Sequence, residues 1–128
     1  LARKMENARA AVPAPEIDGA GAQVGIIAYG TTHHAIAECR HQLRSGHGVE
    51  TDYMRIRALP FSAQVADFLA AHPRLYVVEQ NRDGQLRSIL RAEYPEMAGR
   101  MRSVLHFNGL PIDARFIANA ILAQEKEA

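Results

Sequence analysis

The pattern of hydrophobic and polar positions along the chain predicts four strand and helix units in alternation. Nearly continuous apolar runs over residues 23–29, 74–80 and 103–107 are typical of strands buried on both faces. Residues 49–56 alternate apolar and polar side chains, which predicts a less buried strand nearer the sheet edge. Apolar residues at helical spacing follow each strand, and this alternation favours an α/β fold, a parallel sheet with helices on both faces.

Polar residues mark where the predicted helices begin. Thr31 or Thr32 is expected to cap the first helix, Ser62 the second and Asp113 the last. The first helix is expected to stop at Gly46, because its periodicity ends there.

The connections between these units predict how the strands are ordered. Right-handed crossovers with helices on both faces place the second strand on one side of the first and the third strand on the other. The topological switch point, where ligands bind in such sheets, then lies between residues 23–29 and 74–80. Residues 16–17 are expected to add a short antiparallel strand at the edge.

Two polar segments, residues 29–34 ("YGTTHH") and 79–85 ("EQNRDGQ"), would rim this crevice. Their carboxylates, amides, guanidinium and hydroxyl groups could hold a ligand or a neighbouring protein chain. Alternatively, Asn81 or Asp83 caps the next helix and Arg82 pairs with a carboxylate in solvent. The candidate residues at this crevice or interface are Tyr29, Gly30, Thr31, Thr32, His33, Glu79, Gln80, Asn81, Arg82, Asp83 and Gly84.

The sequence shows no complete catalytic or metal-binding set. His34, Glu38 and His41 share a helix face, but that face is opposite the core stripe and is better explained as a solvated surface. The single cysteine, Cys39, excludes an internal disulfide and cannot by itself hold zinc or an iron–sulfur cluster. We therefore predict that no catalytic residue, metal site or cofactor belongs to this chain.

Length and charge narrow the class of protein. The 128 residues fit one domain. The charge is nearly balanced, with 15 Lys and Arg against 14 Asp and Glu, and no basic stripe interleaved with aromatic residues is present, so we do not expect nucleic-acid binding. The longest apolar stretch, residues 24–29, is far too short to span a membrane, so we expect a soluble, cytoplasmic protein. Residues 1–22 read as a linker from a preceding domain, and residues 23–128 as the α/β domain.

Four segments resemble the transketolase C-terminal-like domain of the alpha subunit of 2-oxoacid:ferredoxin oxidoreductases, which act on pyruvate or 2-oxoglutarate. These are "VGIIAYGTT", "MRIRALPFS", "RLYVVEQNRDGQL" and "NGLPIDARFI", and the resemblance runs from Val24 to Leu122. It implies a three-layer αβα domain with a mostly parallel five-stranded sheet. The fifth strand would be antiparallel at an edge, and residues 15–18 are the candidate for it.

The resemblance also implies a function for the larger protein. Enzymes of this family use thiamine diphosphate, magnesium, coenzyme A and iron–sulfur clusters to convert a 2-oxoacid and coenzyme A to an acyl-CoA and CO₂, and they pass electrons to ferredoxin. Their thiamine sites lie in other domains, so this domain would be a non-catalytic assembly domain. Its partners would be the remaining alpha-subunit domains, the beta subunit, ferredoxin indirectly, and a second copy of the chain.

Two other functions stay open at this point. The chain could be an independent α/β module that binds a nucleotide or anion through the two polar segments. It could also be the C-terminal domain of the beta subunit of a 2-oxoacid dehydrogenase complex, in which "AYG" also occurs and a lipoyl group replaces ferredoxin as the acceptor.

Overall fold

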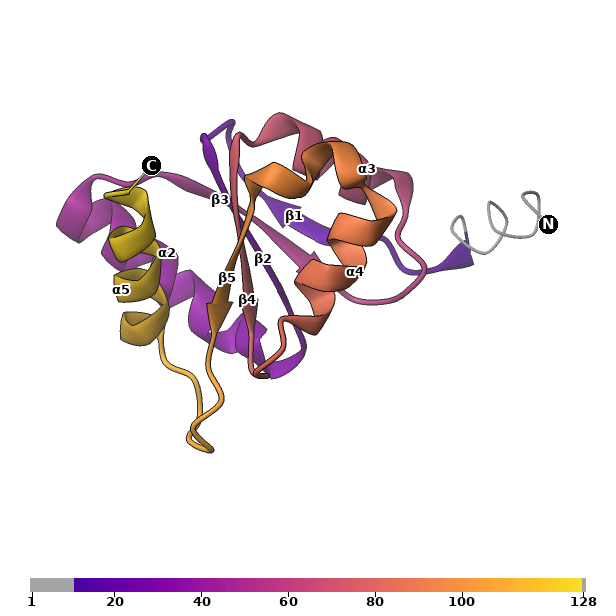
Figure 1. Ribbon diagram of the computed structural model, residues 1–128. Helices are drawn as coiled ribbons and strands as arrows, with labels where there is room; N and C mark the ends of the chain where they lie inside the picture. The colour runs from indigo at the N-terminus through magenta and orange to yellow at the C-terminus, as the bar shows by residue number, and fades with distance from the viewer. Residues whose placement is uncertain (1–10, 128) are drawn as a thin grey trace.

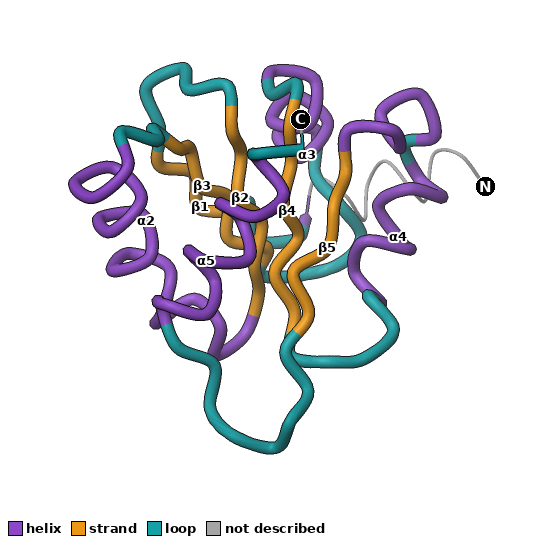
Figure 2. The backbone as a smooth tube through the Cα atoms, turned by 60° about the vertical axis from the view of Figure 1, so that its left-hand side comes forward, coloured by secondary structure: helices purple, strands orange, loops and turns teal. Residues whose placement is uncertain are grey.

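The computed structural model describes residues 11–127, which form one five-stranded sheet between two layers of helices (Figure 1). The strands are β1 Glu16–Asp18, β2 Val24–Tyr29, β3 Thr51–Ile56, β4 Arg74–Glu79 and β5 Met101–Leu105. The α-helices are α2 His33–His47, α3 Ala63–Ala71, α4 Gln85–Glu93 and α5 Ala114–Glu125, and the short 3-10 helices are η1 Gly30–Thr32 and η2 Pro95–Arg100. Helices α2 and α5 cover one face of the sheet, and α3 and α4 cover the other (Figure 2).

The order of the strands confirms the predicted α/β fold. The sheet runs β1-β3-β2-β4-β5, so β3 and β4 flank the central β2 and both are parallel to it. The predicted fifth strand is present as β1, which pairs antiparallel with β3. The switch point therefore lies between β2 and β4, as the crossover argument predicts.

Two apolar cores explain why the strands read as continuous hydrophobic runs. Ile26 of β2 and Tyr76 of β4 face the core beneath α2 and α5. Ile27 and Val77, one position along each strand, face the core beneath α3 and α4. Successive side chains on a strand point to opposite faces, so a strand covered on both sides needs apolar residues at every position.

Strand β3 is more buried than its alternating pattern predicts, and the prediction of a less buried strand near the edge was wrong in this respect. Five of its six residues are buried, Asp52 among them. The first reason is that β1 covers the outer edge of β3. The second is that the charged residue of the strand, Asp52, is stabilised in its buried position by hydrogen bonds from its neighbours.

Asp52 is the centre of a polar cluster at the amino-terminal end of the parallel strands. Its carboxylate accepts hydrogen bonds from the backbone N–H groups of residues 20–22, at 3.0 to 3.3 Å. The ring of His72 lies 2.7 Å from the same carboxylate through Nε2, and its Nδ1 donates to the carbonyl oxygen of Phe68 at 2.7 Å. Asp52 thus ties the loop between β1 and β2 to β3 and to the end of α3.

The structure confirms one predicted helix cap and corrects the others. Asp113 accepts a hydrogen bond of 2.8 Å from a backbone N–H in the first turn of α5, as predicted. Thr32 and Ser62 precede α2 and α3 but make no capping hydrogen bond with any described residue, so those cap predictions were wrong. Helix α2 also continues past Gly46 and ends at His47, and the next residue, Gly48, supplies the left-handed turn with a φ of 67°.

The outer edge of β5 is partly closed by side chains from both helical layers. The backbone carbonyl of Met101 accepts a hydrogen bond of 3.1 Å from Arg87 Nε, and that of Ser103 accepts one of 2.9 Å from Gln124 Nε2. Arg87 belongs to α4 and Gln124 to α5. Unpaired carbonyls on an edge strand are a template for another strand, so both side chains obstruct sheet extension.

We expect the double variant Arg87→Met plus Gln124→Leu to self-associate at least about tenfold more strongly than the original chain, because it frees two backbone carbonyls. Sedimentation velocity over a concentration series measures this. The matched control is Arg91→Met plus Gln64→Leu, which removes the same groups from exposed positions on α4 and α3. Equal association of the two double variants would show that the β5 edge is not protected in this way.

Candidate functional site

The carboxyl ends of β2 and β4 bring the two predicted polar segments together. The side-chain amide of Gln80 donates to the hydroxyls of Thr31 and Thr32, at 3.0 and 2.9 Å. The amide of Asn81 donates to the hydroxyl of Tyr29 at 3.1 Å. These contacts cross the switch point, so the segment that follows β4 lies against the segment that follows β2 because of the strand order.

Glu79, the last residue of β4, is the buried centre of this site. Its side chain is 0% exposed, and its carboxylate accepts hydrogen bonds from the backbone N–H groups of Leu86 at 2.7 Å and Arg87 at 3.2 Å. Asn81 Nδ2 and the hydroxyl of Tyr29 donate to the same carboxylate, at 3.1 and 3.5 Å. The two backbone groups lie in the first turn of α4, where a negative charge is favourable. Glu79 therefore anchors the start of α4.

Asn81 supplies the cap that the capping alternative predicts. Its side-chain oxygen accepts hydrogen bonds from the backbone N–H groups of Gly84 at 2.8 Å and Gln85 at 3.3 Å. Gly84 has a φ of 61°, a left-handed conformation that leads the chain into α4. The same alternative predicts that Arg82 pairs with a carboxylate. The guanidinium of Arg82 instead lies over the ring of Phe107, 5.7 Å from its centroid.

The hydroxyl of Tyr29 is the third member of the polar network that Glu79 and Asn81 form. Burial first, and then the negative charge of Glu79, raise the pKa of Tyr29 above its ordinary value. The phenol therefore stays protonated at neutral pH and donates to Glu79 while it accepts from Asn81. The polar groups of residues 79–81 are thus engaged with one another and with residues 29–32.

His33 lies in a different corner from these residues. Its Nδ1 is 3.0 Å from the hydroxyl of Tyr53 on β3, and the two rings stack. Burial raises the pKa of Tyr53 to about 12, so this hydroxyl stays protonated at neutral pH. Burial and the nearby charge of Arg55 lower the pKa of His33, which leaves its ring neutral at neutral pH. His33 therefore belongs to the contact between α2 and β3.

The remaining histidines and the cysteine have structural surroundings. His34 and Glu38 line a cavity of about 440 Å³ beside the start of α5, and His106 is buried edge-on against Phe116 just after β5. Burial raises the pKa of Cys39 to about 12, so it is an unreactive core thiol at neutral pH.

Among residues 11–127, no three His, Cys, Asp or Glu side chains converge on a metal position. No described helix is long and apolar enough to cross a bilayer.

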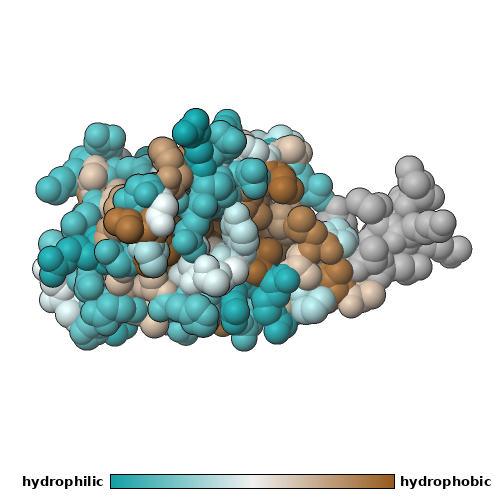
Figure 3. Space-filling view, turned by 90° about the horizontal axis from the view of Figure 1, so that it is seen from below, coloured by the Kyte–Doolittle hydropathy of each residue, from teal (hydrophilic) through white to brown (hydrophobic). Residues whose placement is uncertain are grey.

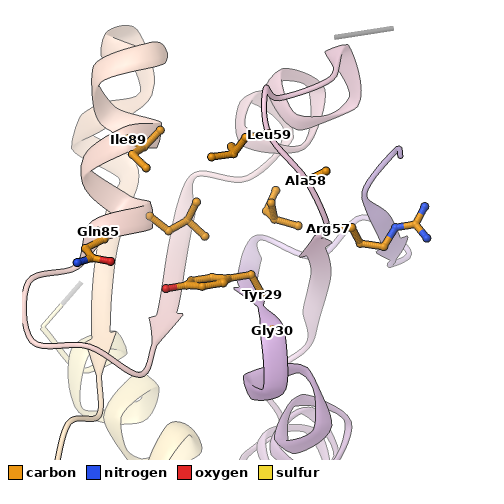
Figure 4. A pocket seen from close by; sticks show the side chains of 9 residues that line it. Tyr29, Gly30, Arg57, Ala58, Leu59, Gln85 and Ile89 are labelled. Carbon is orange, nitrogen blue, oxygen red and sulfur yellow. The ribbon is translucent and has the colours of Figure 1, made fainter. Parts of the chain in front are cut away.

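An apolar groove that no sequence motif indicates lies beside the polar network (Figure 4). Its volume is about 310 Å³, and Leu59 and Ile89 face each other across it, with the ring of Tyr29 below them. Ile89 shares the helical spacing of the buried Leu86 and Leu90, which predicts a core position, yet 44% of its surface is exposed. The groove is lined by Tyr29, Gly30, Ile56, Arg57, Ala58, Leu59, Gln85, Leu86 and Ile89.

The carboxyl-end face of the sheet is accordingly a mixed surface. Figure 3 views the molecule from the side where β5 ends, and hydrophobic side chains gather there in the part of the face toward α4. Phe107 and Leu110 are also strongly exposed, in the loop between β5 and α5 that projects from this end of the molecule (Figure 1). Exposed apolar side chains collected at one end of a domain are typical of a surface that contacts protein.

The chain is similar to solved 2-oxoacid:ferredoxin oxidoreductases. It matches a 2-oxoglutarate:ferredoxin oxidoreductase from Magnetococcus marinus, solved with 2-oxoglutarate, coenzyme A and succinyl-CoA bound, with a TM-score of 0.76 and 27% sequence identity over 90% of this chain. The chain spans 20% of the length of that protein's chain. It therefore resembles one part of a much longer oxidoreductase chain.

A second match supports the fold alone. The alpha chain of a probable 2-oxoacid ferredoxin oxidoreductase from Thermoplasma acidophilum matches with a TM-score of 0.57 and 16% identity, over 88% of this chain and 97% of that one. No protein-family model matches the chain, and no curated protein matches it. The relationship to these oxidoreductases thus rests on three-dimensional structure together with 27% identity to the Magnetococcus enzyme.

Proposed function

We propose that the chain is a non-catalytic assembly domain, of the transketolase C-terminal-like type, in a thiamine-diphosphate-dependent 2-oxoacid:ferredoxin oxidoreductase. That enzyme would convert a 2-oxoacid and coenzyme A to an acyl-CoA and CO₂ and pass the electrons to ferredoxin. The observation that carries the proposal is the match over 90% of this chain to one fifth of a 2-oxoglutarate:ferredoxin oxidoreductase chain, at 27% identity.

The described residues are consistent with a role in assembly. The carboxylate of Glu79 and the amides of Gln80 and Asn81 are bonded to neighbouring groups of the same domain, where they fix the start of α4 and join it to η1. Thiamine diphosphate, magnesium, coenzyme A and iron–sulfur clusters would act in other domains and in the beta subunit of a cytoplasmic enzyme. Within this proposal, residues 79–84 face a neighbouring part of that enzyme.

The proposal includes the boundary of the domain. Residues 1–22 would join a preceding domain of the alpha subunit to the α/β domain, residues 23–128. Residues 1–10 lie outside the described part of the chain. Residues 16–18 pair with β3, and residues 20–22 bond to Asp52, so this segment would hold the domain by its edge where the chain enters it.

The test is an activity measurement on the full-length protein that contains this chain, together with its partner subunit. We expect reduction of ferredoxin that depends on a 2-oxoacid and on coenzyme A. Transfer to a lipoyl acceptor in place of ferredoxin would assign the chain to a 2-oxoacid dehydrogenase complex. Absence of both activities in a complex that retains its thiamine diphosphate would overturn the proposal.

A further inference from the structure

The apolar groove lies between α4 and the loop after β3, and the polar network beside it does not cover the apolar side chains of the groove. Leu59 is 55% exposed and Ile89 is 44% exposed, and the two side chains face each other across the groove (Figure 4). Glu79 and Asn81, by contrast, are engaged in fixing α4 and Tyr29. The network therefore shapes one wall of the groove and leaves its apolar side chains as the free surface.

The lining of the groove selects an uncharged occupant. Its one ionisable side chain besides Tyr29 is Arg57, which points away from the groove and donates to the carbonyl oxygen of Ala14 at 2.9 and 2.7 Å (Figure 4). The hydroxyl of Tyr29 is engaged with Glu79 and Asn81. A charged group in the groove would lose hydration without gaining a charged partner, whereas an apolar group would gain contact with both walls.

The path of the chain indicates where such an occupant would come from. Arg57 belongs to the loop that forms one wall of the groove, and its side chain, which points away from the groove, holds the carbonyl of Ala14, so the chain enters the domain beside that loop. In the matched oxidoreductase, four fifths of the chain lies outside the matched part, since the match covers 20% of it. Another domain of such a polypeptide would be positioned beside the groove by its own linker.

We propose that the groove receives an aliphatic or aromatic side chain from another domain of the same polypeptide. This inference rests on the proposed function and names the surface through which the assembly domain contacts its neighbour. Leu59 and Ile89 form the two walls and Tyr29 the floor. The neighbouring domain inserts an uncharged apolar side chain between them, and this contact buries the exposed surface of Leu59 and Ile89.

The test compares cysteine accessibility at two positions of similar exposure in the full-length enzyme. Leu59→Cys and Ile17→Cys replace side chains that are 55% and 49% exposed in the domain, and neither is in the core. The native Cys39 is buried, and the pKa of its thiol is raised, so it reacts slowly with a maleimide and serves as an internal reference. Labelling by N-ethylmaleimide is followed on the tryptic peptides by mass spectrometry, and Ile89→Cys is a second variant.

We expect Leu59→Cys and Ile89→Cys to be labelled at least about tenfold more slowly than Ile17→Cys in the assembled enzyme. Equal rates would overturn the proposal. Concentration-dependent protection of both positions in the 128-residue chain alone would also overturn it, because the occupant would then be a second copy. Ferredoxin reduction is measured on the same preparation, so an active enzyme with an accessible groove refutes this inference and leaves the proposed function standing.

Discussion

The variant Asp52→Ala is expected to lose about 4 kcal/mol of its free energy of unfolding. Asp52 is buried and accepts hydrogen bonds from the backbone of residues 20–22 and from His72. Without its carboxylate, three backbone N–H groups and the imidazole lose their partner at once, and the loop between β1 and β2 loses its tie to β3. Urea denaturation followed by circular dichroism measures the difference.

The loss should depend on pH in a defined direction. Burial by itself would raise the pKa of Asp52, but hydrogen bonds from His72 and from the backbone outweigh it and hold that pKa below the ordinary value of 3.8. A carboxyl group with a lowered pKa stabilises the fold above its ordinary pKa, and this contribution disappears as the pH falls through the lowered value. The difference between the original chain and Asp52→Ala should therefore shrink as the pH falls below about 4.

Two controls separate the Asp52 cluster from general effects of charge. Asp18→Ala removes an exposed carboxylate whose ion pair with Arg40 lies at the surface, and it should cost less than about 1 kcal/mol. Gly19→Ala leaves all charges in place but puts a methyl group against the carboxylate of Asp52, and it should destabilise the fold measurably. A cost for Asp52→Ala no larger than that for Asp18→Ala would contradict the central position of Asp52.

The variant Glu79→Ala is expected to lose about 3 kcal/mol of unfolding free energy. The change leaves a cavity at the end of β4 and removes the acceptor for the N–H groups of Leu86 and Arg87 at the start of α4. Amide hydrogen exchange should show the first turn of α4 opening more often than in the original chain, while exchange in β2 and β3 changes little. Thermal denaturation and hydrogen exchange together measure both effects.

Gln80→Ala is the matched control for Glu79→Ala. Gln80 is the next residue along the chain and is exposed, and its amide bonds to the hydroxyls of Thr31 and Thr32. We expect a loss below about 1 kcal/mol, because the change removes an exposed amide, and water can reach the exposed hydroxyl of Thr31 in its place. If the two variants were equally destabilised, the buried carboxylate would not be the anchor of α4.

The architecture could be predicted from the sequence because both helical layers cover the sheet. Burial of both faces makes the interior positions of β2 and β4 nearly all apolar, and this produces runs that are easily recognised as strands. The strand order then follows from the handedness of the crossovers. The burial of strand β3 could not be predicted in the same way. An aspartate in an alternating strand indicates a solvent-facing position, and only the three-dimensional structure shows that residues 20–22 cover Asp52.

The residues of the site could be predicted, but their partners could not. The positions of Tyr29, Thr31 and residues 79–81 at the carboxyl ends of adjacent strands follow from the topology. Whether Glu79 faces a ligand or the N–H groups of α4 depends on how the chain turns at Gly84, which sequence spacing does not specify. The exposure of Ile89 has a related cause, because helical spacing identifies a face of α4 but does not show how far the neighbouring loop covers that face.

The assembly role is tested most directly in the full-length enzyme with Arg82→Ala plus Phe107→Ala. Both side chains are exposed at the carboxyl-end face and contact each other, so their removal should leave the domain folded. We predict a smaller fraction of enzyme assembled with its partner subunit, measured by size-exclusion chromatography, and unchanged ferredoxin reduction per assembled complex. Full assembly combined with lower turnover per complex would contradict the account, because the domain would then contribute to the chemistry.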